Sequence, residues 1–494
     1  MGSTQSIMQS QTGWNLDNSY LKLPALFYQQ LAPVPVRAPQ LVLFNHTLAE
    51  QLGLKSQDLN TPQGADIFAG NLLPPGADPI AQAYAGHQFG GFTMLGDGRA
   101  ILLGEQLTPG GERVDIQLKG SGQTPFSRHG DGRAALGPML REYLISESMY
   151  ALGIPTNRSL AVVTTGETVR RENVLPGAIL TRVAASHLRV GTFEYAAWRG
   201  TAADVKILVD YAIRRHYPAV AQQNNSCLAL LEAVIDRHAQ LVAQWLLVGF
   251  IHGVMNTDNV AIAGETIDYG PCAFMDAYNP ATVFSSIDHQ GRYAYTNQAP
   301  ITQWNLTRFA EALLPLLAEQ QEAAIEIAQQ ALDGFTDKFH QAWLRGMRGK
   351  LGLLDAQKDD VALMEELLNI MQRLGADYTN SFRDLANEHV TNNELQRDAA
   401  FQQWQKHWRM RLEQQGQSFS AVKPMMDRHN PAVIPRNHRV EEALAAAEKD
   451  DNLQPLKNLL RVLASPYADL TDTDHDYREP PDPSNRRYQT FCGT

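Results

Sequence analysis

The sequence predicts an α+β fold, with strands concentrated in the first part of the chain and helices in the last part. Up to about residue 205, short apolar segments with strand-like alternation are separated by turns rich in glycine and proline. From Trp304 to about residue 420, apolar residues recur at helical spacing. Because the two patterns occupy different parts of the 494 residues, we expect a strand-rich region followed by a mostly helical one.

The composition excludes several classes of protein. A net charge of -11 argues against a general nucleic-acid binder, because phosphate contacts need clustered lysine and arginine. The three cysteines have neither zinc-site nor disulfide-framework spacing, which favours a reducing cytoplasm. The longest apolar run, Leu241 to Met255, is too short to span a bilayer, and the N-terminus lacks a signal-peptide pattern. We therefore expect a cytoplasmic protein with no nucleic-acid or membrane partner.

Residues 1–80 form a predicted N-terminal extension. Leu41–Phe44 is apolar enough for a strand, and Asn45–Leu52 is typical of a short helix closed by Gly53. Residues 61–79 are rich in glycine and proline and indicate a long surface loop.

A glycine-rich pentapeptide occurs twice in the strand-rich region. Gly-Asp-Gly-Arg-Ala stands at residues 96–100, directly before the apolar segment 101–105, and again at residues 130–134. Glycine lets backbone N–H groups approach phosphate oxygens closely, and Arg99 adds a fixed positive charge. An ordinary hairpin turn is the alternative for each copy taken alone.

The segment 114–119 alternates as a strand does, and Lys119 falls at its end on the face opposite the apolar residues. A lysine at a strand end is usually solvated, but the glycine-rich segments around it make Lys119 a candidate phosphate ligand. A helix is predicted to follow, with Gly137 as N-cap, Pro138 at the first position and Gly153 near its end. Glu142 lies beside its apolar stripe, where it either reaches Lys119 or stays on the surface without a partner.

Arg182 and Arg189 lie seven residues apart in a stretch of apolar and small residues. A half-buried guanidinium needs an anionic partner. A polyphosphate would supply one, and a pair of structural Arg–carboxylate bridges is an equal alternative.

A candidate metal site follows a long apolar segment, residues 228–250, that predicts a buried helix broken by Gly249. Residues 260–267 then indicate a tight hairpin that brings Asp268 close to Asn259. Together with Asp258, these residues offer the hard oxygen ligands that suit Mg²⁺. The alternative is that Asp and Asn flank this hairpin only because they favour turns.

The C-terminal region, residues 301–494, is predicted to be helical up to about residue 420. Its tail from Asp472 to Asn485 is rich in aspartate and proline and is predicted to be extended.

The candidate groups follow the order found in protein kinases: a glycine loop, a strand lysine, a helix glutamate and a later Asn/Asp metal pair. With His252 placed on the kinase catalytic-loop histidine, Asn259 falls on the metal-binding asparagine. The catalytic aspartate of a kinase would then fall at Val254, which cannot accept a proton. Asp258 is the nearby carboxylate able to act as base. Phosphoryl transfer by an unusual kinase and nucleotide binding by a pseudoenzyme remain as alternatives.

Several motifs resemble those of the selenoprotein O family, the kinase-like protein adenylyltransferases, in the family's order. They are residues 84–90, 95–100, 117–120, 127–134, 151–156, 252–259, 268–270, 291–293 and 304–306. The resemblance implies a bilobal, protein-kinase-like fold, with an N-lobe at residues 81–205 and a C-lobe core at residues 206–300. It also implies that ATP lies reversed, so that AMP moves to a Ser, Thr or Tyr hydroxyl of an acceptor protein. Similar proteins transfer UMP when Mn²⁺ is present.

The resemblance also implies roles for particular residues. Asp258 would be the base, Glu142 the partner of Lys119, and Asn259 and Asp268 the ligands of Mg²⁺ or Mn²⁺. The residues that would bind ATP are Gly96, Gly98, Arg99, Lys119, Asp131, Gly132, Arg182, Arg189 and Asp268.

The C-terminus departs from the family pattern, because Cys492 is followed by glycine and threonine where many members have two serines. Some relatives join the C-terminal cysteine or selenocysteine to a second cysteine, whose position here falls near Phe284. Cys272, which lies closer to the candidate metal site, is one candidate partner of Cys492, and redox control through Cys492 is a hypothesis.

Overall fold

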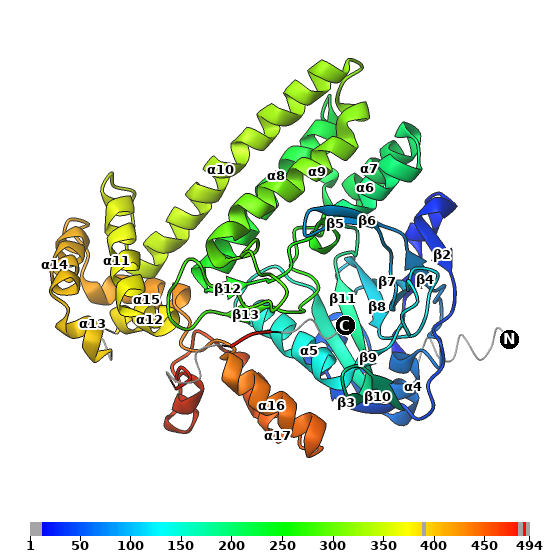
Figure 1. Ribbon diagram of the computed structural model, residues 1–494, viewed down its shortest axis with the longest axis horizontal. Coiled ribbons are helices and arrows are strands. Elements are labelled where there is room, and N and C mark those ends of the chain that lie inside the picture. The colour runs from blue at the N-terminus through cyan, green and yellow to red at the C-terminus, as the bar shows by residue number, and fades with distance from the viewer. Residues whose placement is uncertain (1–11, 388–391, 483–487, 491–494) are drawn as a thin grey trace.

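The strand-rich part of the molecule is one antiparallel sheet of nine strands (Figure 1). The structure, a computed structural model, describes residues 12–387, 392–482 and 488–490. Seven strands follow the order β2-β4-β7-β8-β11-β10-β3, while β1 pairs with β7 and β9 with β11. The bounds are β1 Leu16–Asp17, β2 Tyr28–Gln30, β3 Gln40–Phe44, β4 Ile80–Gln82, β7 Ala100–Leu107, β8 Arg113–Lys119, β9 Ala134–Ala135, β10 Arg158–Arg170 and β11 Val174–Ala184.

Two small hairpin-like sheets lie beside the large one. The first pairs β5 (Ala85–Gln88) with β6 (Gly91–Met94), and its turn places Phe89 and Gly90 at positive φ. The second pairs β12 (Phe250–Ile251) with β13 (Ala273–Phe274). Because β12 and β13 are adjacent, residues 252–272 form a closed loop whose two ends are fixed at one place.

Helix α5 (Leu136–Ala151) packs against the large sheet and carries a predicted site residue, Glu142. The helix contacts β10 and β11, and most of its residues are buried. The predicted N-cap was wrong by two positions: Ala135 is the N-cap, and Gly137 lies inside the first turn. The Gly137 N–H bonds the Glu448 carboxylate at 2.9 Å, so a side chain distant in sequence caps this turn.

The second part of the chain is helical, as predicted, and the long helices α8, α9 and α10 run side by side (Figure 1). Helix α8 ends at Leu247, two residues before Gly249, which has a φ of 73°. The helices are α6 Val190–Arg199, α7 Ala202–His216, α8 Ser226–Leu247, α9 Gln298–Leu317, α10 Gln321–Leu351, α11 Asp360–Leu374, α12 Tyr378–Ala386, α13 Asn393–Arg397, α14 Ala399–Glu413, α15 Phe419–His429, α16 Asn437–Lys449 and α17 Gln454–Leu463.

The N-terminal residues confirm one prediction and correct another. The strand near residue 41 and the following helix, α2 (His46–Gln51), are present, with Asn45 as the cap of α2. Residues 61–79 are not one long loop, because they contain α4 (Pro62–Ala69). Thr61 caps this helix, Pro62 occupies its first turn and Gly70 closes it at a φ of 79°. Glycine and proline are thus helix boundaries here. Helix α3 (Ser56–Leu59) precedes it.

The C-terminal tail also differs from its prediction. Residues Asp472–Tyr477 form a 3₁₀ helix instead of an extended segment, and Asp474 in it bonds both Arg461 and Thr471. Residues 483–485 of the predicted segment lie outside the described residues. The neighbouring helices α16 and α17 pack on α5, so this part of the helical region returns to the helix that covers the sheet (Figure 1).

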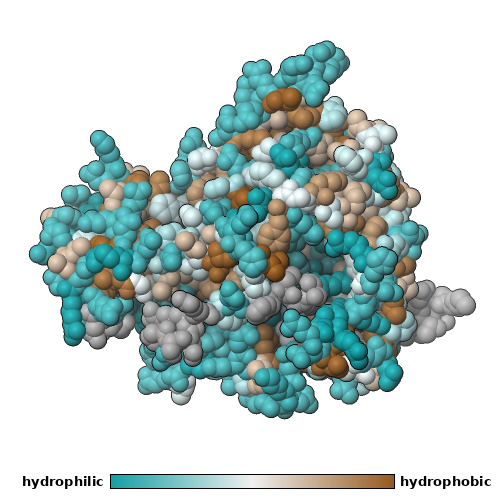
Figure 2. Space-filling view, in the orientation of Figure 1, coloured by the Kyte–Doolittle hydropathy of each residue, from teal (hydrophilic) through white to brown (hydrophobic). Residues whose placement is uncertain are grey.

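The surface view is mostly hydrophilic, with scattered hydrophobic side chains (Figure 2). No helix within the described ranges combines the length and the apolar character needed to cross a bilayer.

Candidate active site

A cavity of about 540 Å³ lies between the large sheet and the loop that follows β12. This volume is in the range of small-molecule sites. The cavity brings together every residue that the sequence proposed as catalytic, ATP-binding or metal-binding. Those residues are Gly96, Gly98, Arg99, Lys119, Asp131, Gly132, Glu142, Arg182, Arg189, Asp258, Asn259 and Asp268.

A buried cluster of charges forms one wall of the cavity. Lys119 at the end of β8 bonds Glu142 of α5 at 2.8 Å, which was one of the two alternatives open for Glu142, and bonds Asp268 at 2.9 Å. Arg182 of β11 bonds the same two carboxylates, with 2.7 Å to Asp268. Burial opposes ionisation of the acids, but the two cations hold the pKa of Glu142 below its usual value and that of Asp268 well below it.

The two arginines of β11 and the following loop have carboxylate partners, which was one of the two open alternatives. Arg182 is satisfied by Glu142 and Asp268. Arg189 lies 3.7 Å from Asp97 and over the ring of Tyr84, and it also donates to the His187 carbonyl. Both side chains still line the cavity, so their positive charge also faces any anion bound there.

The first glycine-rich loop, residues 96–100, packs against residues 124–127, which lie just before the second glycine-rich loop. A Cβ atom on Gly96 would overlap the ring of Phe126, and one on Gly98 would come within 2.8 Å of the Phe126 carbonyl. The Thr124 hydroxyl donates to the Asp97 carbonyl at 2.6 Å. Glycine is therefore required in this loop for close packing of two chain segments as well as for access to the cavity.

Arg99 and Arg128 are the cations best placed for an added anion. Each lines the cavity, and neither has an ion pair with any residue in the described ranges. A phosphate group would give both of them a partner without breaking an existing ion pair.

The second glycine-rich loop is held in place by hydrogen bonds to Arg171 and to Gly122. Asp131 receives two bonds from Arg171, at 2.8 and 3.1 Å, which lower its pKa. A Cβ atom on Gly132 would overlap the backbone of Gly122, whose N–H bonds the Gly132 carbonyl at 3.0 Å. Asp131 lines the cavity with its charge neutralised by Arg171, which favours a role in shaping the loop.

Asp258 is a carboxylate that lines the cavity and has a buried oxygen without a hydrogen-bond partner among the described residues. It lies in a short 3₁₀ helix, Thr257–Asn259, against Gly86 of β5 and the N-terminal turn of α6. Its Oδ1 atom is buried and has no hydrogen-bond partner among the described residues. Burial raises the pKa of Asp258 to about 6, so the group can accept a proton near neutral pH. Val254 lines the same cavity and offers no such acceptor.

Asn259 and Asp268 fit the requirements of a magnesium-type ion. The Asn259 amide nitrogen donates to the Val254 carbonyl at 3.1 Å, which fixes the side chain and leaves its oxygen as an available acceptor. Asp268 bonds Lys119 and Arg182 through Oδ1 alone, so Oδ2 is available too. The described ranges contain no cluster of three or more His, Cys, Asp or Glu residues that would form a protein-only cage. Two protein oxygens completed by substrate phosphates and water are typical of Mg²⁺.

The predicted hairpin between these two residues exists as a single antiparallel bridge, Val260 to Thr266, with a turn at Gly264. Asp268 follows this bridge with a φ of 62°, a conformation that Asp tolerates better than most residues. The turn and the unusual backbone together aim the carboxylate back toward Lys119.

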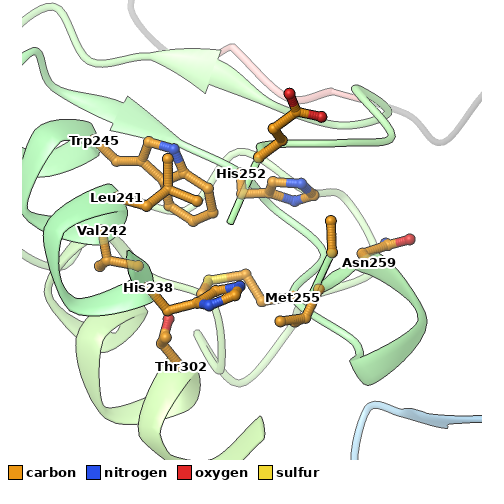
Figure 3. A pocket seen from close by; sticks show the side chains of 11 residues that line it. His238, Leu241, Val242, Trp245, His252, Met255, Asn259 and Thr302 are labelled. Atoms are coloured by element: carbon orange, nitrogen blue, oxygen red, sulfur yellow. The ribbon is translucent and has the colours of Figure 1, made fainter. Parts of the chain in front are cut away.

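A second, small cavity of about 20 Å³ lies between α8 and residues 252–268, which we call the metal-site loop (Figure 3). His238 of α8 and His252 face it from two sides, and Met255 and Asn259 also line it. His238 Nδ1 bonds the Val234 carbonyl at 2.9 Å, and His252 Nε2 bonds the Ile267 carbonyl at 2.9 Å. Burial lowers the pKa of both imidazoles, that of His238 to about 4, so both are neutral. Each ring therefore retains one nitrogen lone pair without a partner among the described residues.

Cys272 is buried with a free thiol, and burial raises its pKa to about 12, so it is a poor nucleophile here. Cys492 lies outside the described residues, and its suggested pairing and redox role stay hypotheses. Phe284, near which the family resemblance places the second cysteine, is buried.

Sequence reasoning missed several residues that shape the site. Asp97 is buried beneath Arg189 and bonds the backbone N–H of Gln82 at 3.1 Å. It belongs to the repeated pentapeptide, which was a usable signal. Arg128, Arg171 and Phe126 also line the cavity. Their positions depend on how two loops fold together, and spacing along the chain does not encode that.

The site joins a lysine–glutamate pair, an Asn/Asp oxygen pair, a carboxylate with an unpartnered oxygen and an excess of arginine, which are the groups that suit a phosphorylated substrate and a divalent cation. Residues 12–464 match the family model described as protein adenylyltransferase SelO. The chain belongs to this family.

Curated relatives agree over nearly their full length. The chain is 59% identical over 482 residues to protein nucleotidyltransferase YdiU of Geobacillus kaustophilus (strain HTA426), covering 98% of this chain and 99% of that protein. It is 59% identical over 489 residues to the protein of the same name from Shouchella clausii (strain KSM-K16), covering 99% and 100%. The corresponding protein of Syntrophotalea carbinolica (strain DSM 2380 / NBRC 103641 / GraBd1) is 58% identical over 482 residues, covering 98% of each chain.

Proposed function

We propose that the protein transfers AMP from ATP to a Ser, Thr or Tyr hydroxyl of an acceptor protein and releases pyrophosphate. The observation that carries the proposal is Asp258, a carboxylate whose buried Oδ1 atom has no partner among the described residues and which lines a cavity in which cationic side chains outnumber acidic ones. Family membership and the names of the relatives support a nucleotidyl transfer.

The proposed reaction places the acceptor hydroxyl beside Asp258. The hydroxyl oxygen attacks the α-phosphorus of ATP, its proton passes to Asp258, and the bond between the α-phosphorus and the bridging oxygen to the β-phosphate breaks. Pyrophosphate departs with that bridging oxygen and the electron pair. Arg99 and Arg128, which lack ion pairs with described residues, stabilise the charge that develops on the leaving group.

Lys119, Glu142 and Arg182 act as a fixed frame in this proposal. Their mutual bonds hold the Asp268 carboxylate in place before substrate arrives, so no reorganisation is needed during the reaction. Asn259 and Asp268 would hold Mg²⁺ or Mn²⁺, which supplies charge neutralisation of the phosphates when bound.

We further propose that the fold is kinase-like, with an N-lobe at residues 81–205 and a C-lobe core at residues 206–300. The support is the strand lysine, which pairs with a helix glutamate and with Asp268 from the loop after β12, and Asn259, which lines the same cavity.

The proposal is tested with Asp258→Asn. We expect the turnover number to fall about 100-fold or more, because general-base catalysis contributes roughly that much, while the dissociation constant for ATP stays within about twofold. Asp210→Asn is the control, since Asp210 is exposed and pairs with Lys206 on α7. A turnover number of Asp258→Asn equal to that of the unmodified protein would show that another group is the base.

A further inference from the structure

An exposed aromatic patch lies at the mouth of the site. Within the described ranges, four aromatic side chains are strongly exposed: Phe89 (40%), Phe92 (39%), Tyr150 (47%) and Trp198 (69%). Three of them, Phe89, Phe92 and Trp198, belong to the β5–β6 hairpin and the adjacent end of α6, and we call these three the aromatic patch. Large exposed aromatic groups are costly in water and mark binding surfaces when they gather.

The aromatic patch is continuous with half-buried rings. The ring centroids of Phe92 and Trp198 are 5.4 Å apart, and those of Phe92 and His87 are 5.3 Å apart. His87 in turn lies 5.4 Å from Trp304 of α9. The exposed rings are therefore held by packing from below and present a preformed surface, which lowers the entropic cost of binding a partner.

The same hairpin is fastened to the loop that carries Asp258. The His87 N–H donates to the Thr257 hydroxyl at 2.7 Å, and the Phe89 N–H donates to the Asn256 side chain at 3.0 Å. Gly86 packs directly on Asp258. A segment bound on the aromatic patch is thereby placed in a fixed position relative to the proposed base.

The patch is not a simple extension of the nucleotide cavity. Phe89 lines that cavity, whereas Phe92 and Trp198 do not. A positive group stands beside it: the Arg292 guanidinium lies over the ring of Trp304 at 4.8 Å and has no ion pair with any described residue. The surface thus combines aromatic area with an unpaired cation, the two features that dominate protein–protein hot spots.

We propose that the aromatic patch docks the acceptor protein, and that it selects an extended segment with a bulky apolar residue close to the modified hydroxyl and an acidic residue opposite Arg292. This inference rests on the proposed function, since it names the class of acceptor for that site. Strand β6 pairs only with β5 among the described strands, so an extended segment can also align along its free edge.

The first test measures binding alone, so that it does not depend on catalysis. The probes are fluorescent twelve-residue peptides with one central Ser, Thr or Tyr, flanked either by Leu and Glu or by Ser and Lys. The unmodified protein is expected to bind the Leu/Glu peptides at least tenfold more tightly than the Ser/Lys peptides. Phe92→Ser and Trp198→Ser are expected to weaken Leu/Glu binding at least tenfold. The matched control is Leu354→Ser, because Leu354 is an exposed apolar residue (54%) in the connection after α10.

The second test exchanges charges. Arg292→Glu is expected to bind the Leu/Glu peptides more weakly than the unmodified protein does. A peptide with Leu and Lys flanks is expected to bind this variant more tightly than the Leu/Glu peptide does. The dissociation constant for ATP should stay within about twofold in all patch variants.

Four results would overturn the docking proposal: no peptide preference, equal binding by Leu354→Ser and the patch variants, loss of ATP affinity in Phe92→Ser or Trp198→Ser, or a change of oligomeric mass in those variants. The last two would assign the patch to the nucleotide or to a second copy of the chain. If the peptides bind selectively but ATP labelled at the α position transfers no label to them, the docking proposal is supported and the proposed function is refuted.

Discussion

At the scale of single residues, the site separates cations that hold the structure together from cations that are free to bind a substrate. Lys119 bonds Glu142 at 2.8 Å and Asp268 at 2.9 Å. Arg182 bonds Asp268 at 2.7 Å and also bonds Glu142. Arg99 lines the same cavity without an ion pair among the described residues. The two groups of cations should therefore respond differently to substitution.

We expect Arg99→Ala and Arg128→Ala each to raise the dissociation constant for ATP about tenfold. A charged hydrogen bond contributes roughly 1.5–3 kcal/mol, and about 1.4 kcal/mol corresponds to a factor of ten. Calorimetric titration with ATP measures the effect, and thermal unfolding should change little because no ion pair is lost. Arg409→Ala on the exposed face of α14 is the control. Unchanged affinity in both variants would mean that the phosphates bind elsewhere.

Part of this residue-level picture could be predicted from the sequence. The Lys119–Glu142 pair follows from two periodicities, strand alternation and the helical stripe, which place each side chain on a known face. The partners of Arg182 could not be decided, because a buried guanidinium needs an anion whatever its source. Asp97 was missed, because its partners Gln82 and Arg189 lie on other elements and meet it only in the folded chain.

At the scale of elements, the β5–β6 hairpin fixes the loop that carries Asp258. Its contacts depend on glycine, since α6 and the 3₁₀ helix at Thr257–Asn259 both approach the hairpin backbone closely. The sequence showed glycines here but gave no register for the hairpin. Helix α4 was missed for a related reason, because its Pro62 and Gly70 indicate a loop unless they are recognised as the first and last positions of a helix.

Gly86→Ala is expected to abolish most activity while the protein stays folded, because the added Cβ would overlap Asp258 Oδ1 and displace the proposed base. The matched control is Gly91→Ala on the same hairpin, where a Cβ would meet only the Gln88 carbonyl, at 3.5 Å. Transfer rates and circular dichroism of the two variants check this. Equal activities would show that the contact between β5 and Asp258 is not needed.

The small cavity between α8 and the metal-site loop is expected to hold one water molecule. Its volume of about 20 Å³ is sufficient for one water, and the free nitrogens of His238 and His252 are both acceptors, so a single water can donate one hydrogen to each. A high-resolution crystal structure should show a density peak within hydrogen-bond distance of both rings. An empty cavity, or rings rotated to other partners, would refute this expectation.

At the scale of the whole molecule, the C-terminal helical region packs back onto helix α5, which covers the sheet. Glu448 of α16 caps the first turn of α5, and Arg141 of α5 pairs with Glu441 of α16 at 2.9 Å. The sequence predicted the helical character of this region but not this return, because the pairs lie about 300 residues apart. At the junction of α10, α12 and α15, Lys350 is buried against the rings of Tyr378 and Phe382.

Lys350 should make the free energy of unfolding depend on pH. Burial lowers its pKa to about 7 from the usual 10.5, so between these values the unfolded chain binds more protons than the folded one. The Lys350 contribution to the free energy of unfolding therefore rises with pH across this window, by up to about 1.4 kcal/mol per pH unit. Lys350→Met lacks this pH-dependent contribution. Its free energy of unfolding should therefore exceed that of the unmodified protein by the largest amount near pH 7, and the difference should shrink toward pH 9.5. Urea unfolding of both proteins measures this, and a constant difference would contradict it.

In the proposed function, the cavity presents the α-phosphorus of ATP to the acceptor hydroxyl. The most direct test supplies ATP labelled at either the α or the γ position, with Mg²⁺ or Mn²⁺ and a generic acceptor protein such as casein. We predict that only the label at the α position enters protein, and that α-labelled ATP releases unlabelled pyrophosphate. Transfer of the γ label would contradict the account and identify the protein as a kinase that works without an aspartate at residue 254.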